Sequence, residues 1–122
     1  MSAFGDSLKK NLASYRHAFN GIKYVLGHEN NIFYQLVAAI VTILAGYILG
    51  LDKTEWIIIT LMIGLVLTAE TFNTAIEKLA DHLHPQKHPA IGLVKDIAAG
   101  AVLIIAITAV IIGLIIFGGK LI

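Results

Sequence analysis

The sequence has no cysteine, only two prolines among 122 residues, and charged residues at just 14%. The missing cysteines exclude disulfides and thiolate metal sites. A Gly-x-Gly-x-x-Gly motif is absent, and Gly118-Gly119-Lys120 lacks the rest of a phosphate-loop pattern. The first six residues have no charged n-region before an apolar stretch, so we expect no cleaved signal peptide. The net charge of +1 says nothing by itself about partners, and we expect no nucleic-acid partner.

Apolar residues dominate instead, at 57% of the chain with a mean hydropathy of +0.82. A soluble domain of this size has too little interior to bury that much apolar surface. Residues 32–51 and 97–117 carry no charge, and about twenty helical residues cross a hydrocarbon core of roughly 30 Å. We therefore predict an all-α membrane protein, one domain over 1–122, with transmembrane helices at 32–51, 56–82 and 95–118.

The connections are predicted from polar and helix-breaking residues. We expect a polar turn at 52–55, and a loop or broken helix start at 83–94, where Pro85, Pro89 and Gly92 lie. Gly118-Gly119 is expected to end the third span.

In residues 1–28, apolar side chains recur every three or four residues, and basic side chains lie mostly on the other side of the expected helix. A basic amphipathic helix on the membrane surface is the favoured interpretation, and a helix packed on its own protein is a compatible alternative. Gly21 and Gly27 are expected to bend or break it. The apolar positions are Leu8, Leu12, Tyr15, Phe19, Ile22 and Leu26, and the basic ones are Lys9, Lys10, Arg16 and Lys23.

Basic residues predict the orientation. With three spans, the N-terminus and region 78–95 share one side and hold seven Lys or Arg, against Lys53 and Lys120 on the other. The positive-inside rule places the richer side in the cytoplasm, where ATP and magnesium are found.

The most informative residues form a polar stripe directly after the apolar run 56–69. Glu70, Asn73, Glu77 and Asp81 are spaced by three, four and four, so they fall within an arc of about 80° on one helix face. Ionisable residues at membrane depth indicate function, here the binding of a cation or a cation–phosphate complex. The alternative is an interhelical hydrogen-bond network that specifies an oligomer.

Two further groups are expected on the same membrane face. Lys95 and Asp96, with Gly92 nearby, suit a phosphate and a metal or lysine, although a snorkelling lysine beside its neighbour is the commoner explanation for such a pair. Glu29 and Asn31 precede the first span, where helix capping is an alternative role. Together with the stripe, these acids supply the hard oxygen ligands that suit Mg²⁺. His82, His84 and His88 leave a zinc site as a minor alternative.

These residues resemble a known family. Glu70-x-x-Asn73-x-Ala75-Ile76-Glu77-x-x-x-Asp81, His88-Pro89 and the run from Lys95-Asp96 to Val102 are similar to the small bacterial integral-membrane diacylglycerol kinase and undecaprenol kinase family. The resemblance implies a surface helix, three transmembrane helices and a homotrimer with active sites at the cytoplasmic membrane boundary.

The resemblance also implies roles for the matching residues. Glu70 would be the general base, and Glu70 and Asn31 would bind the lipid. Glu29 and Glu77 would hold Mg²⁺. The nucleotide would be bound by Glu29, Asn73, Glu77, Asp81, His88, Gly92, Lys95 and Asp96. Gln35 stands where some diacylglycerol-specific members carry an acid, which leaves the choice between diacylglycerol and undecaprenol open.

We therefore expect an ATP- and Mg²⁺-dependent lipid kinase of the bacterial inner or plasma membrane. It would phosphorylate a primary hydroxyl at the cytoplasmic interface. Ala98-Ala99-Gly100-Ala101 permits close helix contact and supports a homo-oligomer. The alternatives are a small cation channel or transporter subunit, and a non-catalytic membrane assembly protein.

Overall fold

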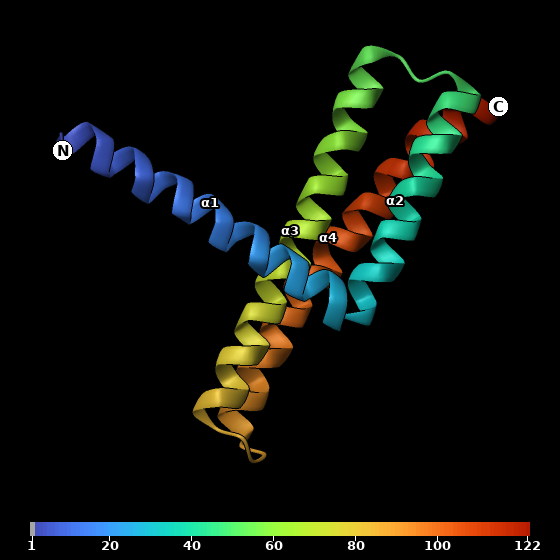
Figure 1. Cartoon of the computed structure of the whole chain (residues 1–122). Helices are drawn as coiled ribbons and strands as arrows, with labels where there is room; N and C mark the ends of the chain where they lie inside the picture. The colour runs from blue at the N-terminus through green and yellow to red at the C-terminus, as the bar shows by residue number, and fades with distance from the viewer. Residues whose placement is uncertain (1) are drawn as a thin grey trace.

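The computed structural model describes residues 2–122, which form four α-helices. They are α1 (Ala3–His28), α2 (Asn30–Leu49), α3 (Lys53–Leu83) and α4 (Pro89–Leu121) (Figure 1). The predicted all-α class is confirmed. Helices α2, α3 and α4 are each long and apolar enough to cross a membrane, so the chain is a membrane protein with three candidate spans.

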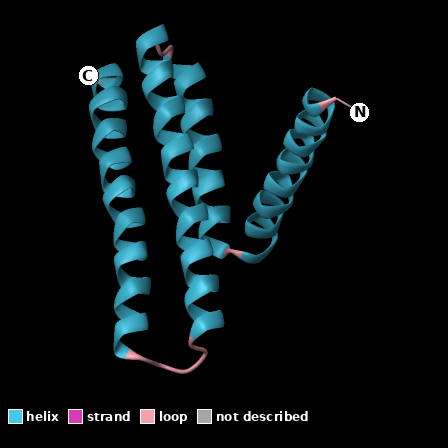
Figure 2. Ribbon diagram, turned by 90° about the vertical axis from the view of Figure 1, so that its left-hand side faces the viewer, coloured by secondary structure: helices cyan, strands magenta, loops and turns pink. Residues whose placement is uncertain are grey.

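Helix α1 is a single uninterrupted helix. Ser2 caps it by accepting a hydrogen bond from the Gly5 amide at 3.1 Å. The predicted break at Gly21 or Gly27 is wrong, because a helical glycine costs only about 1 kcal/mol and does not by itself end a helix. Both ribbon views show α1 diverging from the other helices and approaching them only near its C-terminal end, where Val25 is buried (Figure 2).

One residue separates α1 from α2. Glu29 has an extended backbone (φ −111°, ψ 120°), and its amide still donates to Val25 O at 3.0 Å. The chain therefore changes direction at Glu29 without a loop. This junction lies partway along α3, so the C-terminal part of α3 and the N-terminal part of α4 extend past it (Figure 1).

The connection between α2 and α3 is shorter than expected. Gly50 adopts a left-handed conformation (φ +73°), which closes α2 at little steric cost. The predicted polar turn at 52–55 is wrong, because α3 already begins at Lys53. Asp52 and Glu55 form a capping box in which each side chain accepts from the other's backbone amide, at 2.8 and 3.0 Å.

The loop between α3 and α4 is also shorter than the predicted 83–94. Helix α4 starts at Pro89, whose fixed φ suits the first helical position, and His88 caps it by accepting from the Ala90 amide at 3.1 Å. Gly118-Gly119 does not end α4, which continues to Leu121. Lys95 and Asp96 therefore lie on a regular helix one turn or more from its start.

Helices α3 and α4 form the main packed pair and run side by side in both ribbon views. Leu51, Ile59 and Ile116 make an apolar cluster at the end away from the α3–α4 loop, with Trp56 and Phe117 against it. Trp56 also approaches Gly46 so closely that a Cβ there would lie 2.7 Å from its ring. Many apolar side chains on α2 and α4, such as Ile48 and Ile104, stay exposed, as expected for helices in lipid.

Candidate active site

The predicted polar stripe lies on the half of α3 nearer the α3–α4 loop. Glu70 has only 1% of its surface exposed, and Asn73 and Thr74 are buried beside it. Glu77 is partly buried, while Asp81, nearer the end of the helix, is exposed. The stripe therefore runs from a buried carboxylate to an open one along a single helix.

Glu70 is held from two helices. Gln35 Nε2 on α2 donates to Glu70 Oε2 at 3.2 Å, and Thr74 Oγ1 donates to the Glu70 carbonyl at 3.0 Å. The charges of Glu29 and Glu77 act on the same carboxyl group, and the Asn31 side chain faces it. The structure thus brings the start of α2 to the deepest residue of the stripe.

Asn73 and Glu77 form the middle of the site. Asn73 Nδ2 donates to Glu77 Oε1 at 3.3 Å, and Asn73 Oδ1 is buried with no hydrogen-bond partner in residues 2–122. A buried acceptor without a donor is costly, and a cation satisfies such an oxygen as well as a donor does. The neighbouring Glu77 carboxylate is an oxygen ligand of the kind Mg²⁺ prefers, so these residues fit the metal that the resemblance implies.

The protein supplies a partial set of metal ligands. Across the described residues, no group of three or more His, Asp or Glu side chains converges in a geometry that would hold a metal ion. Mg²⁺ normally takes only one or two protein carboxylates and completes its shell with water and substrate phosphates. A pair such as Glu29 and Glu77 therefore suits Mg²⁺ bound together with a nucleotide.

Lys95 connects α4 to the stripe. Its ammonium lies 2.5 Å from Asp81 Oδ1, and its charge also interacts with Glu77. Lys95 and Asp81 keep 36% and 58% of their side-chain surfaces exposed, so water screens their ion pair. Because this pair is open to water, a phosphate group can exchange with Asp81 as the partner of Lys95.

The remaining predicted residues lie around this cluster. His88 caps α4 and packs against His84 with ring centroids 4.8 Å apart. Gly92, in the first turns of α4, has open space where a Cβ would lie. Asp96 is exposed, and no hydrogen bond or ion pair within residues 2–122 joins it to the stripe. The roles of these three residues stay predictions.

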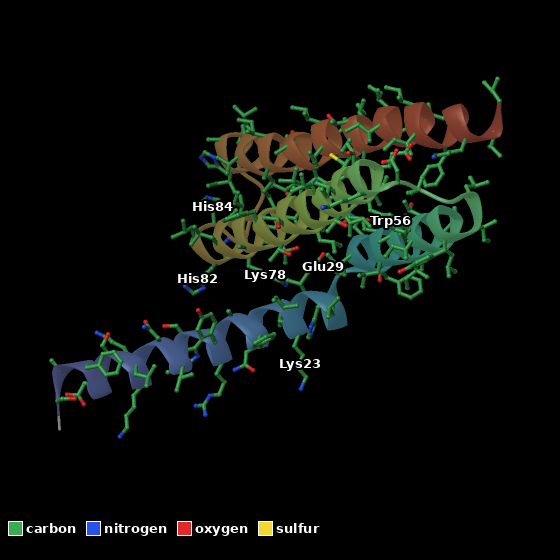
Figure 3. All side chains as sticks on the ribbon, turned by 90° about the horizontal axis from the view of Figure 1, so that it is seen from above. Lys23, Glu29, Trp56, Lys78, His82 and His84 are labelled. Carbon is green, nitrogen blue, oxygen red and sulfur yellow. The ribbon has the colours of Figure 1, made fainter. Side chains whose placement is uncertain are left out.

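Two contacts were not anticipated from the sequence. Gln35 departs from a family pattern, and a carboxamide inside an apolar span is itself a signal of a polar partner. Lys78 lies over the Tyr24 ring, 5.4 Å from its centroid, and its charge interacts with Glu29. Figure 3 shows Glu29, at the junction of α1 and α2, and Lys78, on α3, near the place where α1 approaches α3. Lys78 directly follows Glu77, so spacing alone placed it off the stripe.

Comparison with known proteins identifies the family. The family described as prokaryotic diacylglycerol kinase matches residues 16–117. An undecaprenol kinase of Bacillus subtilis (strain 168) is 38% identical over 116 residues, which are 95% of this chain and 94% of the relative. A diacylglycerol kinase of Synechocystis sp. is 35% identical over 84% of this chain, which spans 59% of that relative's length. A diacylglycerol kinase of Haemophilus influenzae is 27% identical over 85% of this chain and 89% of its own length.

The chain therefore belongs to the prokaryotic diacylglycerol kinase family, and the protein is a lipid kinase. Membership of a kinase family argues against the two alternatives left by the sequence, a channel subunit and a non-catalytic assembly protein.

Proposed function

We propose that the protein transfers the γ-phosphoryl group of ATP to the primary hydroxyl of a membrane lipid, with Mg²⁺ as cofactor. The burial of Glu70, at the depth where α1 meets α2, carries this proposal. A carboxylate there meets a hydroxyl that arrives laterally from the bilayer, while the open end of the stripe at Asp81 and Lys95 faces the side from which ATP arrives. The lipid then reaches the site from within the bilayer, and ATP reaches the same site from the water.

Each residue has a distinct task in this proposal. Glu70 binds the lipid hydroxyl, with Asn31 beside it, and takes its proton as the oxygen attacks phosphorus. Glu29 and Glu77 hold Mg²⁺, which when bound neutralises charge on the phosphates. Lys95 exchanges Asp81 for a phosphate oxygen, and Asn73 orients Glu77. His88, Gly92 and Asp96 are proposed to line the nucleotide side of the site.

The lipid is undecaprenol or diacylglycerol. The names of the relatives include both, and the relative at 38% identity, which this chain matches along 94% of its length, is an undecaprenol kinase.

The proposed setting is the bacterial inner or plasma membrane, crossed three times, with the N-terminus and the site on the cytoplasmic side. The seven-to-two distribution of basic residues supports this orientation. Helix α1 is proposed to lie on the membrane surface, because Leu8, Leu12, Tyr15, Phe19, Ile22 and Leu26 are all exposed along it.

A homotrimer is the proposed assembly. Gly92 and Gly100 on α4 have open space where a Cβ would lie, and such positions permit close approach of another helix. Native mass measurement in detergent tests the assembly, and a purely monomeric species would contradict it.

The function is tested with purified protein in mixed micelles containing labelled ATP, Mg²⁺ and either undecaprenol or diacylglycerol. Transfer of label to one lipid, dependent on Mg²⁺, is expected. Glu77→Gln should shift the Mg²⁺ titration to higher concentration, since one metal ligand loses its charge. No transfer to either lipid by the folded wild-type protein would overturn the proposal, and an unchanged titration would remove Glu77 as a ligand.

A further inference from the structure

The side-chain amide of Gln35 is hydrogen-bonded through its nitrogen, while its oxygen has no partner within residues 2–122. Its nitrogen donates to Glu70 Oε2 at 3.2 Å. Its oxygen is buried and accepts no hydrogen bond from any described residue. A buried, unpaired acceptor costs about 1–3 kcal/mol, so this oxygen favours a site where a donor arrives from outside the chain.

The same side chain closes one end of an apolar groove. A cavity of about 360 Å³ lies between α2, α3 and α4, and small or aliphatic side chains such as Ala39, Ile63 and Ala109 line it. Along α4 the groove extends from Ala106 to Phe117, about 16 Å at the helical rise. Its volume falls in the range of small-molecule sites.

Gln35 is the polar group with an open position at this groove. Thr42 also lines the groove, but its hydroxyl already donates to the Ala38 carbonyl at 2.7 Å. The groove therefore has an apolar body and one unpaired acceptor at the end beside Glu70. A molecule that matches this arrangement has a hydroxyl at one end and a hydrocarbon chain behind it.

We propose that Gln35 is a positioning residue for the lipid substrate, a long-chain primary alcohol. Its amide oxygen receives the O–H of the lipid, its amide nitrogen orients the Glu70 carboxylate beside that hydroxyl, and the hydrocarbon chain lies in the groove. This inference rests on the proposed function and adds the place where the lipid binds. The hydroxyl carries a single proton, so it first donates to the Gln35 oxygen and then turns to the Glu70 carboxylate, which takes the proton as the oxygen–phosphorus bond forms and the bond to the ADP leaving group breaks.

The test separates the two halves of the amide. Gln35→Leu removes both contacts, so the apparent KM for lipid in mixed micelles should rise about tenfold while the KM for ATP stays constant. Gln35→Glu keeps an oxygen acceptor but sets a second acid beside Glu70, so kcat should fall with the lipid KM nearly unchanged. A side chain with a merely structural role would give no such split.

Thr60→Val is the matched control. Thr60 is a polar residue of α3 outside the groove, and its hydroxyl is satisfied by the Trp56 carbonyl at 2.8 Å. Its KM and kcat should match wild type. If wild type phosphorylates lipid and Gln35→Leu keeps the wild-type lipid KM, the inference fails and the proposed function stands. If wild type phosphorylates no lipid, the proposed function itself fails.

The groove is tested without relying on activity. A diacylglycerol and a polyprenol carrying a diazirine in the hydrocarbon chain should label residues between Ala106 and Phe117 on α4, and Ala109→Phe should suppress this label. Label confined to other helices would overturn the placement of the chain. Loss of the oligomer in Ala109→Phe, with labelling and lipid KM unchanged, would assign the groove to a second copy of the chain and overturn the proposal.

Discussion

The α3–α4 hairpin buries apolar side chains at one end and polar side chains along the half that carries its loop. At the first end, Leu51, Ile59 and Ile116 pack together, and the nearby polar groups are paired with one another. Glu55 completes the capping box, and its Oε1 also forms an ion pair with Lys120 Nζ at 2.9 Å. In the other half, Glu70, Asn73 and Thr74 are buried, and Asn73 Oδ1 has no partner among the described residues.

The packed end of this helix pair therefore contributes to stability, and the polar half carries the groups suited to chemistry. Paired polar groups and close packing hold a structure together, whereas buried groups with open positions destabilise it unless a ligand fills them. We therefore expect substitutions at the packed end to change the free energy of unfolding, and substitutions in the polar half to change phosphoryl transfer.

The largest effect is expected at Glu70. Glu70→Gln should lower lipid phosphorylation about 100-fold or more, because general-base catalysis contributes that much and an amide accepts no proton at neutral pH. Its helix content and thermal unfolding should stay near wild type, since an amide oxygen at this position still accepts from Gln35. Glu55→Gln, the same change at the packed end, should leave transfer within about twofold. Activity of Glu70→Gln within a few-fold of wild type would exclude Glu70 as the base.

Gly46 gives the largest expected stability effect. A Cβ at this position would lie 2.7 Å from the Trp56 ring and 2.9 Å from Leu51 Cδ1, so Gly46→Val should destabilise the protein by about 1–3 kcal/mol through overpacking. Gly64→Val is the control, because a Cβ there meets nothing within 4 Å. Unfolding in detergent should separate the two variants. Equal losses would mean that the contact with Trp56 does not limit this position.

A smaller loss is expected from breaking the ion pair at the packed end. Lys120→Met keeps an apolar stem but removes the charge opposite Glu55, and the cost should be about 0.2–1 kcal/mol because both side chains remain partly exposed. The loss should shrink at high salt, whereas an uncharged packing effect would not respond to salt. Lipid phosphorylation should not change.

The smallest effect is a pH dependence at the start of α3. The backbone amide of Glu55 donates to Asp52 and holds the pKa of that carboxyl below its ordinary value. The folded state therefore favours the ionised cap. Its stabilisation is complete above the ordinary pKa of about 3.9 and is lost as the pH falls through the lower folded value. Asp52→Asn caps without titrating, so the difference in melting temperature between wild type and variant should narrow or reverse only below about pH 4. A constant difference across pH 3–7 would contradict this assignment.

Local patterns predicted the helices well and their ends less well. The stripe from Glu70 to Asp81 follows from helical periodicity alone, and α3 indeed carries these residues in one continuous helix. Helix ends depend on caps, however, and composition misplaced them. The Asp52–Glu55 capping box starts α3 three residues before the apolar run, and Pro89 starts α4 within the stretch predicted as loop.

The sequence patterns do not predict which residues of different helices contact each other. The bonds from Gln35 to Glu70 and from Lys95 to Asp81 depend on how far one helix is shifted along another. That shift is set by packing of many side chains, and no spacing within a single helix encodes it. The candidate site was therefore predictable as a set of residues on the same membrane face, but its pairings were not.

The single extended residue between α1 and α2 has a mechanical consequence. Helix α1 has 26 residues, so it is about 39 Å long, and its only covalent connection to the other helices is through Glu29. A rotation of about 10° in the backbone at this point displaces the far end of α1 by about 7 Å. A ligand that binds the Glu29 side chain would therefore also act on the direction in which α1 leaves the other three helices.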